Sequence, residues 1–316
     1  MNGNNNPLVS ILIFSYNHEQ YIAECLESIL VQNYPNIELI VIDDCSPDKT
    51  WEIIENYKLR CKQKLHNINF ILKDTNKGLV DSINQGVNVA TGDFILMCAS
   101  DDKLASNKTI SKLVNTMRQL SKDYAIVSCD NQIIDENSSI CYWDKNRENI
   151  YNKNKATYKS FGDFLKYERS EINFASEDYG SYKSILLGNY ISNGYLTKLK
   201  AFKEILPLNK NAIDDWQIHL KMSKLYKYKY FDEPLFAYRW HGANTMKNQA
   251  KVYGLGIKAF FDEKDYCFKN GLKMTWLKKY LLMWFLKNII LKSPRLYNFV
   301  SDAYKKIINK KSKENL

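Results

Sequence analysis

The feature that most constrains this chain is an apolar run that ends in two adjacent carboxylates. Phe94 to Ala99 is short and unbroken, and Asp101 and Asp102 follow it almost at once. Such a run is typical of a strand buried on both faces. The two carboxylates then stand at the carboxyl end of a central strand, where open α/β sheets bind ligands. Because their charges repel, they predict a partner cation, most simply a divalent metal ion; the alternative is a solvated turn that caps the next helix.

Length and composition favour a folded domain in a reducing compartment. The chain has 316 residues, 45% of them hydrophobic, which is enough for one large domain or two smaller ones. The polar N-terminus carries no basic stretch, and no apolar run reaches the ~20 residues of a membrane-spanning helix, so we expect neither a signal peptide nor a span. The seven cysteines are scattered without a Cys-x-x-Cys pair, which predicts free thiols rather than disulfides or a zinc site.

Apolar strands alternate with amphipathic helices as far as Asp130. This alternation predicts right-handed crossovers and an α/β fold, with a mainly parallel sheet flanked by helices. We expect helix N-caps at Asn17, Ser46 and Ser106. The expected strands are 9–14, 37–42, 69–72, 94–99 and 125–128, and the expected helices begin near 17, 46, 79 and 107.

The carboxyl ends of these strands bring an aromatic ring and several carboxylates to one rim. Tyr16, the Asp43–Asp44 pair and the Asp101–Asp102 pair each follow a predicted strand. A nucleotide needs a stacking surface, acceptors for base and ribose donors, and neutralisation of its phosphates. An aromatic ring, carboxylates and a carboxylate-held metal supply these three.

The pattern changes after the fifth predicted strand. Residues 131–190 have weak periodicity, and we interpret them as an insertion of loops and short helices on the acceptor side of the rim; a plain surface excursion is the alternative. An interrupted strand over 189–196, a helix from Asp214 and a late strand over 228–231 complete a domain that we place at residues 1–245.

Residues 246–316 are predicted to form a basic helical tail. From Gly271 to the C-terminus, eleven Lys and Arg stand against Asp302 and Glu314, so this stretch holds +9 of the net charge of +10. A DNA-binding core would carry its own basic face, so we expect no nucleic-acid partner. Helices over 275–291 and 296–308 suit an anionic membrane surface, and the alternative is a helix pair packed on the main domain.

Taken in order, the motifs make the chain resemble the family 2 glycosyltransferases, which have the GT-A fold. Any one motif is weak, but the ordered set covers roughly Pro7 to Thr245. The matching stretches are Val9–Asn17, Ile40–Ser46, Asn76–Leu79, Ser82–Gly86, Ala90–Asp93, Ala99–Asp102, Asp214–Trp216 and Tyr238–Asn244.

The resemblance implies roles for individual residues. Tyr16 would stack on the nucleotide base, Asp44 would accept from the base N–H, and Asp101 would hold the ribose or sugar. The residues expected to contact the nucleotide sugar are Ser15, Tyr16, Asn17, Asp44, Lys77, Asn84, Asp101 and Arg239.

The resemblance also implies a metal and a base. Asp102 would ligate Mg²⁺ or Mn²⁺ bridging the diphosphate, with His241 beside it, and Asp215 would be the general base. Ala99 stands where many members carry a further Asp, which leaves fewer carboxylates for the metal, and Asp214 replaces the more usual Glu. Asp214 could instead cap its helix, and Asp43 is expected to brace the Ser46 turn.

The expected reaction is the inverting transfer of a sugar from a nucleotide-diphosphate sugar, with UDP ahead of GDP or dTDP by the family's habits. The acceptor would be a lipid-linked saccharide of a bacterial surface polymer, at the cytoplasmic face of the plasma membrane. One rival is a nucleotidyltransferase, which should carry a Gly-rich basic loop where this chain has Ser15-Tyr-Asn-His-Glu19. The other is a non-catalytic carbohydrate-binding protein on the same fold.

Overall fold

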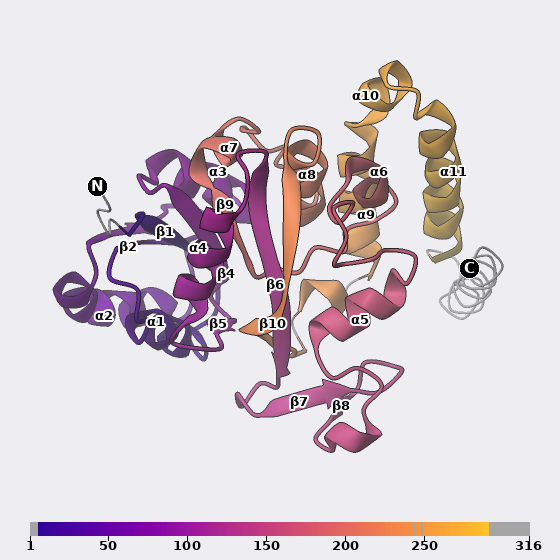
Figure 1. The fold of residues 1–316 in the computed structure, drawn as a ribbon. Helices are drawn as coiled ribbons and strands as arrows, with labels where there is room; N and C mark the ends of the chain where they lie inside the picture. The colour runs from indigo at the N-terminus through magenta and orange to yellow at the C-terminus, as the bar shows by residue number, and fades with distance from the viewer. Residues whose placement is uncertain (1–5, 243, 248, 291–316) are drawn as a thin grey trace.

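The computed structural model describes residues 6–242, 244–247 and 249–290, and a single ten-stranded sheet forms its centre (Figure 1). Neighbouring strands follow the order β3-β2-β1-β4-β9-β6-β10-β5, and β7 and β8 extend from the end of β6. The strands are β1 (Val9–Ser15), β2 (Ile37–Asp43), β3 (Asn67–Leu72), β4 (Phe94–Ala99), β5 (Lys103–Leu104), β6 (Tyr124–Ile134), β7 (Ile140–Trp143), β8 (Asn149–Ile150), β9 (Tyr195–Lys198) and β10 (Lys227–Arg239).

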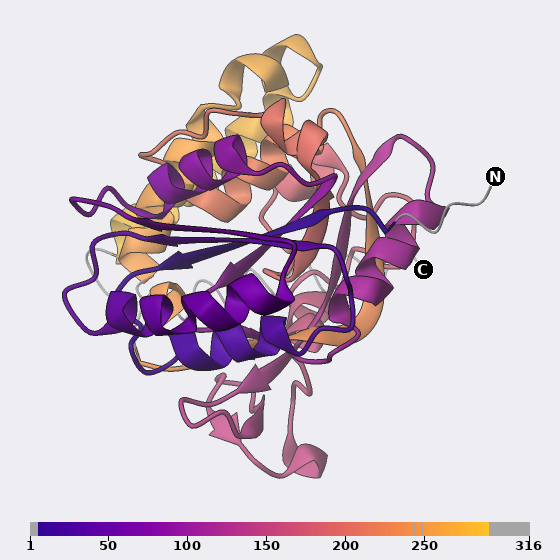
Figure 2. The same ribbon diagram turned by 90° about the vertical axis from the view of Figure 1, so that its left-hand side faces the viewer.

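Helices cover both faces of this sheet (Figure 2). The α-helices are α1 (Ile22–Leu30), α2 (Thr50–Lys64), α3 (Leu79–Val89), α4 (Thr109–Gln119), α5 (Phe161–Glu168), α6 (Tyr182–Leu186), α7 (Leu199–Lys203), α8 (Asp214–Met222), α9 (Gln249–Phe261), α10 (Lys264–Lys269) and α11 (Lys273–Ile290). Two 3₁₀ turns, η1 (Lys153–Lys155) and η2 (Thr245–Lys247), lie between them.

The predicted parallel arrangement is confirmed for the first half of the sheet. β1 pairs in parallel with β2 on one side and β4 on the other, and β2 pairs in parallel with β3. Every residue of β2 is buried, as a strand covered on both faces requires. The apolar side chains of α1, α2 and α4 pack on one face, and those of α3, α7 and α8 pack on the other.

The second half of the sheet departs from the expected alternation. β9 lies antiparallel between β4 and β6, and β10 is a long strand parallel to β6. β6 itself runs on to Ile134, into the segment that we expected to be irregular. Its polar residues concealed it: Ser128, Asp130 and Asn131 are all buried within the strand, which removes the apolar pattern that the prediction used.

Three predicted helix caps are wrong by a few residues. α1 begins at Ile22, because Asn17 takes a left-handed turn (φ 59°) after β1 rather than starting the helix. α2 begins at Thr50, whose backbone N donates to the Asp48 carboxylate (3.0 Å), and α4 begins at Thr109. In each case an extra turn at the rim precedes the helix, and capping residues are common in such turns as well.

The C-terminal helices pack on the main domain as far as the structure describes them. The Trp276 indole of α11 stacks on Phe260 of α9 (5.2 Å between ring centroids), and its Nε1 donates to the Phe260 carbonyl (3.1 Å). No helix in the described part of the chain is long and apolar enough to cross a membrane. The helix expected over 296–308 lies outside the described residues. All seven cysteines are free, as predicted.

Candidate active site

The rim is held together where β1 and β2 end side by side. Asp43 is fully buried and accepts hydrogen bonds from Ser15 Oγ (2.8 Å) and from the backbone N and Oγ of Ser46 (2.7 and 2.6 Å). The prediction that Asp43 braces the Ser46 turn is confirmed. The buried Ser15 hydroxyl is occupied by this bond, so it supports the rim rather than facing a ligand. Tyr16, at the end of β1, is half exposed, so solvent reaches its ring there.

Asp44 anchors the loop that leads into α3. Its two oxygens accept from the backbone N of Lys77 (3.0 Å) and Gly78 (2.6 Å), and Lys73 Nζ lies 3.0 Å from Oδ1. Lys73 is itself buried and also donates to Ser82 Oγ (2.7 Å). The carboxylate therefore shapes the bottom of the rim, while the Lys77 side chain points to solvent. A carboxylate offers about four lone pairs, so Asp44 keeps acceptor capacity for a ligand N–H.

Asp101 faces two histidines. Its Oδ2 lies 3.1 Å from His241 Nε2, and His18 Nδ1 is hydrogen-bonded to the neighbouring Ser100 hydroxyl (2.6 Å). Burial opposes ionisation of Asp101, but the hydrogen bond to His241 and the nearby His18 hold its pKa below the usual value. Burial also lowers the pKa of His18. The sheet thus presents an ionised carboxylate between two imidazoles that come from the ends of β1 and β10.

Asp102 occupies a different environment from its neighbour. Its Oδ1 accepts the backbone N–H of Arg239 (2.8 Å), and the side chain is buried. Burial, reinforced by the charge of Asp101, raises the pKa of Asp102 well above the usual value. Asp101 is the carboxylate that is hydrogen-bonded to the His241 imidazole, and Asp102 ties β10 to the end of β4.

Arg239 is a buried brace. Its guanidinium donates from Nε to the Asp101 carbonyl (2.7 Å), from Nη1 to Ser138 Oγ (2.8 Å) and from Nη2 to Glu24 Oε2 (2.6 Å). It also lies over the Tyr21 ring, 4.6 Å from the centroid. These three contacts use its donors within the protein and fix the Asp101 backbone. Arg239 therefore serves as a structural brace, whereas we expected it to contact the diphosphate.

Glu24 completes this brace from the first turn of α1. It accepts from Arg239, Lys103 and Ser138. Burial would raise its pKa, but these hydrogen bonds lower the pKa to about 2. No local pattern marks Glu24 or Lys103 in the sequence, because their partners lie far away along the chain. His18 and Lys73 were also missed, although His18 directly follows Asn17 after the first predicted strand and Lys73 directly follows the third.

Asp215 lies in the first turn of α8. Burial raises the pKa of the Tyr238 hydroxyl, and the charges of the Asp101–Asp102 pair and of Asp215 add to that rise. Burial and the neighbouring Asp214 raise the pKa of Asp215 itself well above the usual value. Among the described residues, no hydrogen bond or ion pair reaches its carboxylate. A carboxylate that resists ionisation is the stronger base.

Two other predicted site residues are engaged elsewhere. Both ends of the Asn84 amide pair with the backbone of Leu208 (2.8 and 3.2 Å), so Asn84 joins α3 to the loop before α8. The backbone N of Asn17 donates to Ser46 Oγ (3.0 Å), and the Asn17 side chain is exposed. The structure pairs Asp101 with His241, and Tyr16 and Asp44 directly follow β1 and β2 at the same edge of the sheet.

The donor set at Asp101 suits a divalent cation that a substrate shares. Within the described residues, no group of three or more His, Cys, Asp or Glu side chains is arranged to hold a metal. One carboxylate and one imidazole would therefore be the protein ligands, through Asp101 and His241. Mg²⁺ typically takes one or two carboxylates and completes its shell with water and substrate phosphates, so this small set fits.

Comparison with known sequences decides the family. A sequence model of glycosyl transferase family 2 matches residues 10–169, about half of the chain. The chain belongs to family 2 of the glycosyltransferases. The match covers Asp44 and Asp101 and ends before Asp215 and His241.

Curated relatives extend this result unevenly. The glycosyltransferase GlyG of Streptococcus pneumoniae is 25% identical over 277 residues, covering 86% of this chain and 84% of that protein. A putative teichuronic acid biosynthesis glycosyltransferase of Bacillus subtilis, TuaG, is 33% identical over 107 residues, covering 34% of this chain and 41% of that protein. Two further relatives, 34% and 41% identical, match over less than half of their own length.

Solved structures share the fold at low identity. TarS residues 1–349 of S. aureus with UDP-GlcNAc superimpose with a TM-score of 0.59 at 18% identity, covering 86% of this chain and 72% of that one. The mannosyltransferase PcManGT from Pyrobaculum calidifontis, solved with GDP-Man and Mn²⁺, gives a TM-score of 0.60 at 13% identity. That match covers 95% of this chain and 81% of PcManGT. The fold of this family 2 chain is GT-A.

Proposed function

We propose that this chain transfers a sugar from a nucleotide-diphosphate sugar to an acceptor hydroxyl, with inversion at the anomeric carbon. The observation that carries the proposal is the Asp101–His241 pair, 3.1 Å apart at the carboxyl end of β4, together with Asp215, whose charge acts on the same Tyr238 as that of Asp101. One side of this arrangement suits a diphosphate and the other suits an incoming alcohol. The TarS and PcManGT structures, which hold UDP-GlcNAc and GDP-Man, support a nucleotide-sugar donor.

The donor would lie along the rim from β2 towards β4. The exposed Tyr16 ring would stack on the base, and Asp44 would accept from a base N–H. UDP is our first candidate, and the TarS structure that holds UDP-GlcNAc supports this choice. Asp101 and His241 would hold Mg²⁺ or Mn²⁺ against the diphosphate. When bound, the ion neutralises the charge that builds up on the departing diphosphate.

Asp215 would act on the other substrate. The bond between the anomeric carbon and the diphosphate oxygen breaks, and a bond to the acceptor oxygen forms on the opposite face of the sugar. The proton of the acceptor hydroxyl passes to the Asp215 carboxylate. Its raised pKa suits this task, and the absence of a protein partner within the described residues leaves the carboxylate available to the acceptor.

A donor panel with and without metal tests the proposal. UDP-, GDP- and dTDP-sugars are added to the whole chain with Mn²⁺ or with EDTA, and melting temperature and donor hydrolysis are measured. We expect one donor class to raise the melting temperature only when Mn²⁺ is present, since a ligand that binds the folded state stabilises it. Binding without hydrolysis or transfer would favour the carbohydrate-binding alternative. Failure of every donor to bind would overturn the proposal.

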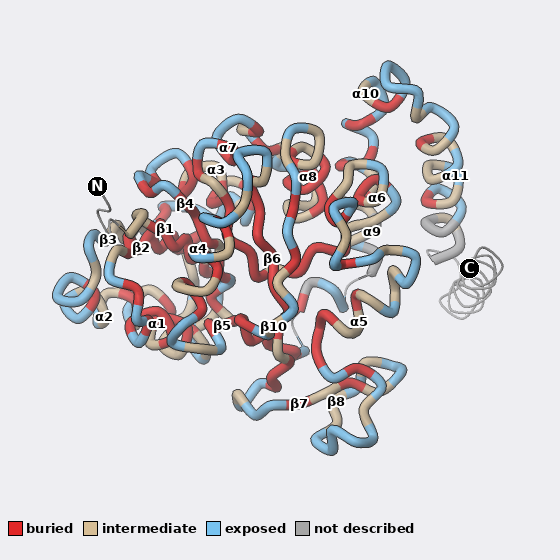
Figure 3. Tube along the Cα trace, viewed as in Figure 1, coloured by how far each residue is buried: buried red, intermediate tan, exposed pale blue. Residues whose placement is uncertain are grey.

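A second proposal concerns the C-terminal helices: we infer that they place the enzyme on an anionic membrane, where a lipid-linked saccharide of a surface polymer would be the acceptor. α11 buries Trp276 but exposes Leu281, Trp284 and Phe285. Figure 3 shows buried and exposed stretches alternating along the trace of this helix. Residues 291–316 follow with seven Lys and Arg against two acidic residues. Exposed aromatic and aliphatic side chains beside basic residues suit the interface of an anionic bilayer, which in a bacterium is the inner face of the plasma membrane.

Vesicle co-sedimentation tests this placement. The whole chain should pellet with vesicles of phosphatidylcholine plus phosphatidylglycerol and stay in solution with phosphatidylcholine alone. Replacing Trp284 and Phe285 together by Ser should reduce the pelleted fraction severalfold. The matched change Leu59→Ser, at an exposed apolar site on α2, should leave it unchanged. Equal pelleting of the double variant and the wild-type chain would rule out α11 as the contact.

A further inference from the structure

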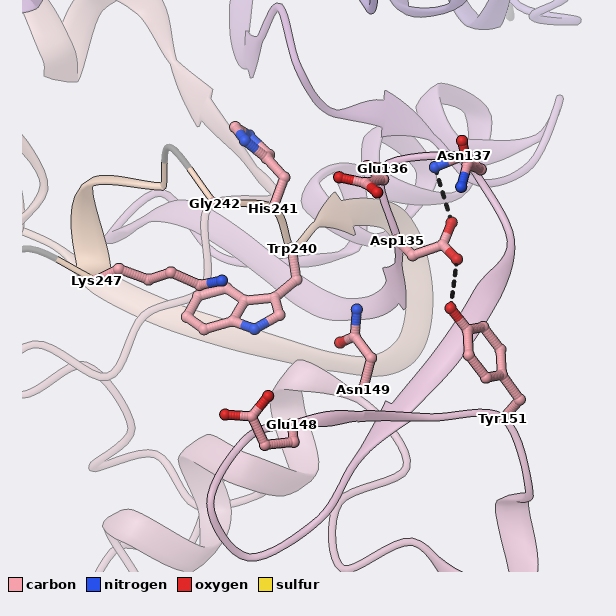
Figure 4. A pocket seen from close by; sticks show the side chains of 10 residues that line it. All are labelled: Asp135, Glu136, Asn137, Glu148, Asn149, Tyr151, Trp240, His241, Gly242 and Lys247. Atoms are coloured by element: carbon pink, nitrogen blue, oxygen red, sulfur yellow. Dashed lines mark hydrogen bonds between the residues drawn. The ribbon is translucent and has the colours of Figure 1, made fainter.

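A pocket of about 310 Å³ opens beside His241 (Figure 4). Its volume is within the range of small-molecule sites. It lies between the tip of the β6–β7 hairpin, β8 and the segment that follows β10. The residues that line it are Asp135, Glu136, Asn137, Glu148, Asn149, Tyr151, Trp240, His241, Gly242 and Lys247.

The strand order fixes where this pocket lies relative to the donor. β2 and β1 carry the proposed base site, β4 carries Asp101, and β6 and β10 end next to the pocket. Because β4, β6 and β10 share one direction, their carboxyl ends form one continuous rim. A donor that runs from β2 to β4 would leave the pocket beyond its diphosphate, on the far side of His241 from the base.

One polar group in the pocket lacks a partner in the described structure. Asn149 Oδ1 is buried and makes no hydrogen bond there, although buried amides are almost always paired. Figure 4 shows its amide between Trp240 and Asp135, directed into the pocket. A bound hydroxyl or amide at this place would supply the missing bond.

A rigid aromatic ring forms another wall. Tyr151 is exposed, yet its hydroxyl donates to Asp135 Oδ2 (2.7 Å), which fixes the position of the ring. Asp135 is buried and also accepts from the backbone N of Asn137 and Ser139 (both 2.9 Å). Its carboxylate is thus committed to shaping the pocket. An exposed ring held in place costs little entropy when a flat ligand packs on it.

The charge of the lining narrows the class of ligand. Asp135, Glu136 and Glu148 bring three carboxylates, and Lys247 brings one ammonium, which lies over the Trp240 ring at 4.7 Å. A phosphate or a uronic acid would meet excess negative charge. A sugar unit with hydroxyls, or with an amine, meets acceptors that it can satisfy.

We propose that this pocket is a saccharide subsite for the acceptor, which takes a unit without negative charge, either neutral or amine-bearing. The identity of the occupant as acceptor rests on the proposed glycosyl transfer. The pocket itself rests on the unpartnered Asn149, the fixed Tyr151 and the surplus of carboxylates. Its ligand packs on Tyr151 and bonds to Asn149 and Glu148.

Saturation-transfer NMR with methyl glycosides tests the subsite without knowledge of the natural acceptor. The probes are the methyl glycosides of N-acetylglucosamine, glucosamine and glucuronic acid. The wild-type chain should bind at least one of the first two and not the glucuronide. Asn149→Ala and Glu148→Ala should each weaken that binding about 5- to 10-fold, as loss of one hydrogen bond does. Glu177→Ala, at an exposed site, serves as the matched control.

The melting-temperature shift caused by a UDP-sugar and Mn²⁺ is measured on the same variants. An unchanged shift with weakened glycoside binding supports the subsite. Absence of glycoside binding to the wild-type chain, equal binding by the Ala variants, or equal binding of the glucuronide overturns it, whatever the donor does. If the wild-type chain binds no donor, the proposed function is overturned. The glycoside data then still decide whether the pocket binds a saccharide.

Discussion

The donor side and the acceptor side of this molecule treat their polar groups in opposite ways. On the donor side, at the ends of β1, β2 and β4, the buried Asp43, Asp44 and Asp102 all have protein partners. Residues 131–230 include the insertion that we place on the acceptor side (131–190), and there the described structure leaves six buried polar side-chain atoms unpaired. They belong to Asn131, Trp143, Asn149, Tyr195 and Tyr230.

This difference indicates which part of the site is preformed. A satisfied network is rigid, so the donor side can hold a nucleotide without rearrangement. Unpaired buried groups cost free energy, and they persist where a ligand or water completes them. Of this set, Asn149 lines the pocket beside His241, and it is the group whose hydrogen bond we expect a ligand to complete. Substitutions on the two sides should consequently differ in kind.

The largest effect is expected for Asp215→Asn, because the acceptor side holds the least satisfied carboxylate. Turnover should fall about 10²- to 10⁴-fold, the usual contribution of a general base, while donor binding stays. Stability should rise by about 1 kcal/mol, or roughly 2 °C in melting temperature, since a charge that burial disfavours is removed. Initial rates and melting curves measure both.

The pH dependence of that gain gives an internal check. A raised folded-state pKa means that ionisation of Asp215 costs stability above the ordinary carboxyl pKa. The stability gained by Asp215→Asn should therefore be complete at pH 8, and it should shrink as the pH falls towards the ordinary carboxyl pKa. Asp178→Asn, at an exposed site, should show no gain at either pH. A gain confined to acid pH would contradict the interpretation.

A pair of substitutions tests the division of labour between neighbouring carboxylates. Asp101→Asn should abolish the Mn²⁺-dependent part of the donor-induced melting shift, since the carboxylate that faces His241 is lost. Asp102→Asn should keep most of the Mn²⁺-dependent melting shift, because an amide oxygen can still accept the hydrogen bond from Arg239 N. The reverse result would restore Asp102 as the metal ligand, as the sequence resemblance implies.

The sequence predicts most of the donor side and little of the acceptor side. Strands 9–15, 37–43 and 94–99 are continuous and apolar, so their ends, and with them Asp44 and Asp101, can be located. The part of β6 beyond Ser128 was not predicted because the buried polar residues Asp130 and Asn131 broke its apolar pattern. Glu24 was missed because its partner Arg239 lies 215 residues away. The chemistry of adjacent Asp101 and Asp102 could not be separated either, since only the direction of each side chain distinguishes them.

Arg239→Lys probes the rigidity attributed to the donor side. Lysine keeps the charge but cannot reach Asp101 O, Ser138 and Glu24 together. We expect a loss of about 3 kcal/mol in the free energy of unfolding, in line with breaking a buried hydrogen-bonded ion pair. Urea denaturation measures the loss. A change below about 0.5 kcal/mol would mean that the donor side is no more rigid than an ordinary surface.

The smallest effect is expected at Glu24, where the donor-side brace reaches solvent. Its folded-state pKa of about 2 lies below the ordinary value of 4.5, so its stabilisation is complete above that ordinary value and is lost as the pH falls towards 2. Its side chain is 36% exposed, and screening limits the contribution to about 0.5–1 kcal/mol. Glu24→Gln should therefore lower stability at pH 7 by that amount and flatten the acid limb of the stability curve between pH 4.5 and 2. Urea unfolding at a series of pH values, with Glu177→Gln as the exposed control, tests this. An unchanged acid limb would show that Arg239 is held by its neutral partners alone.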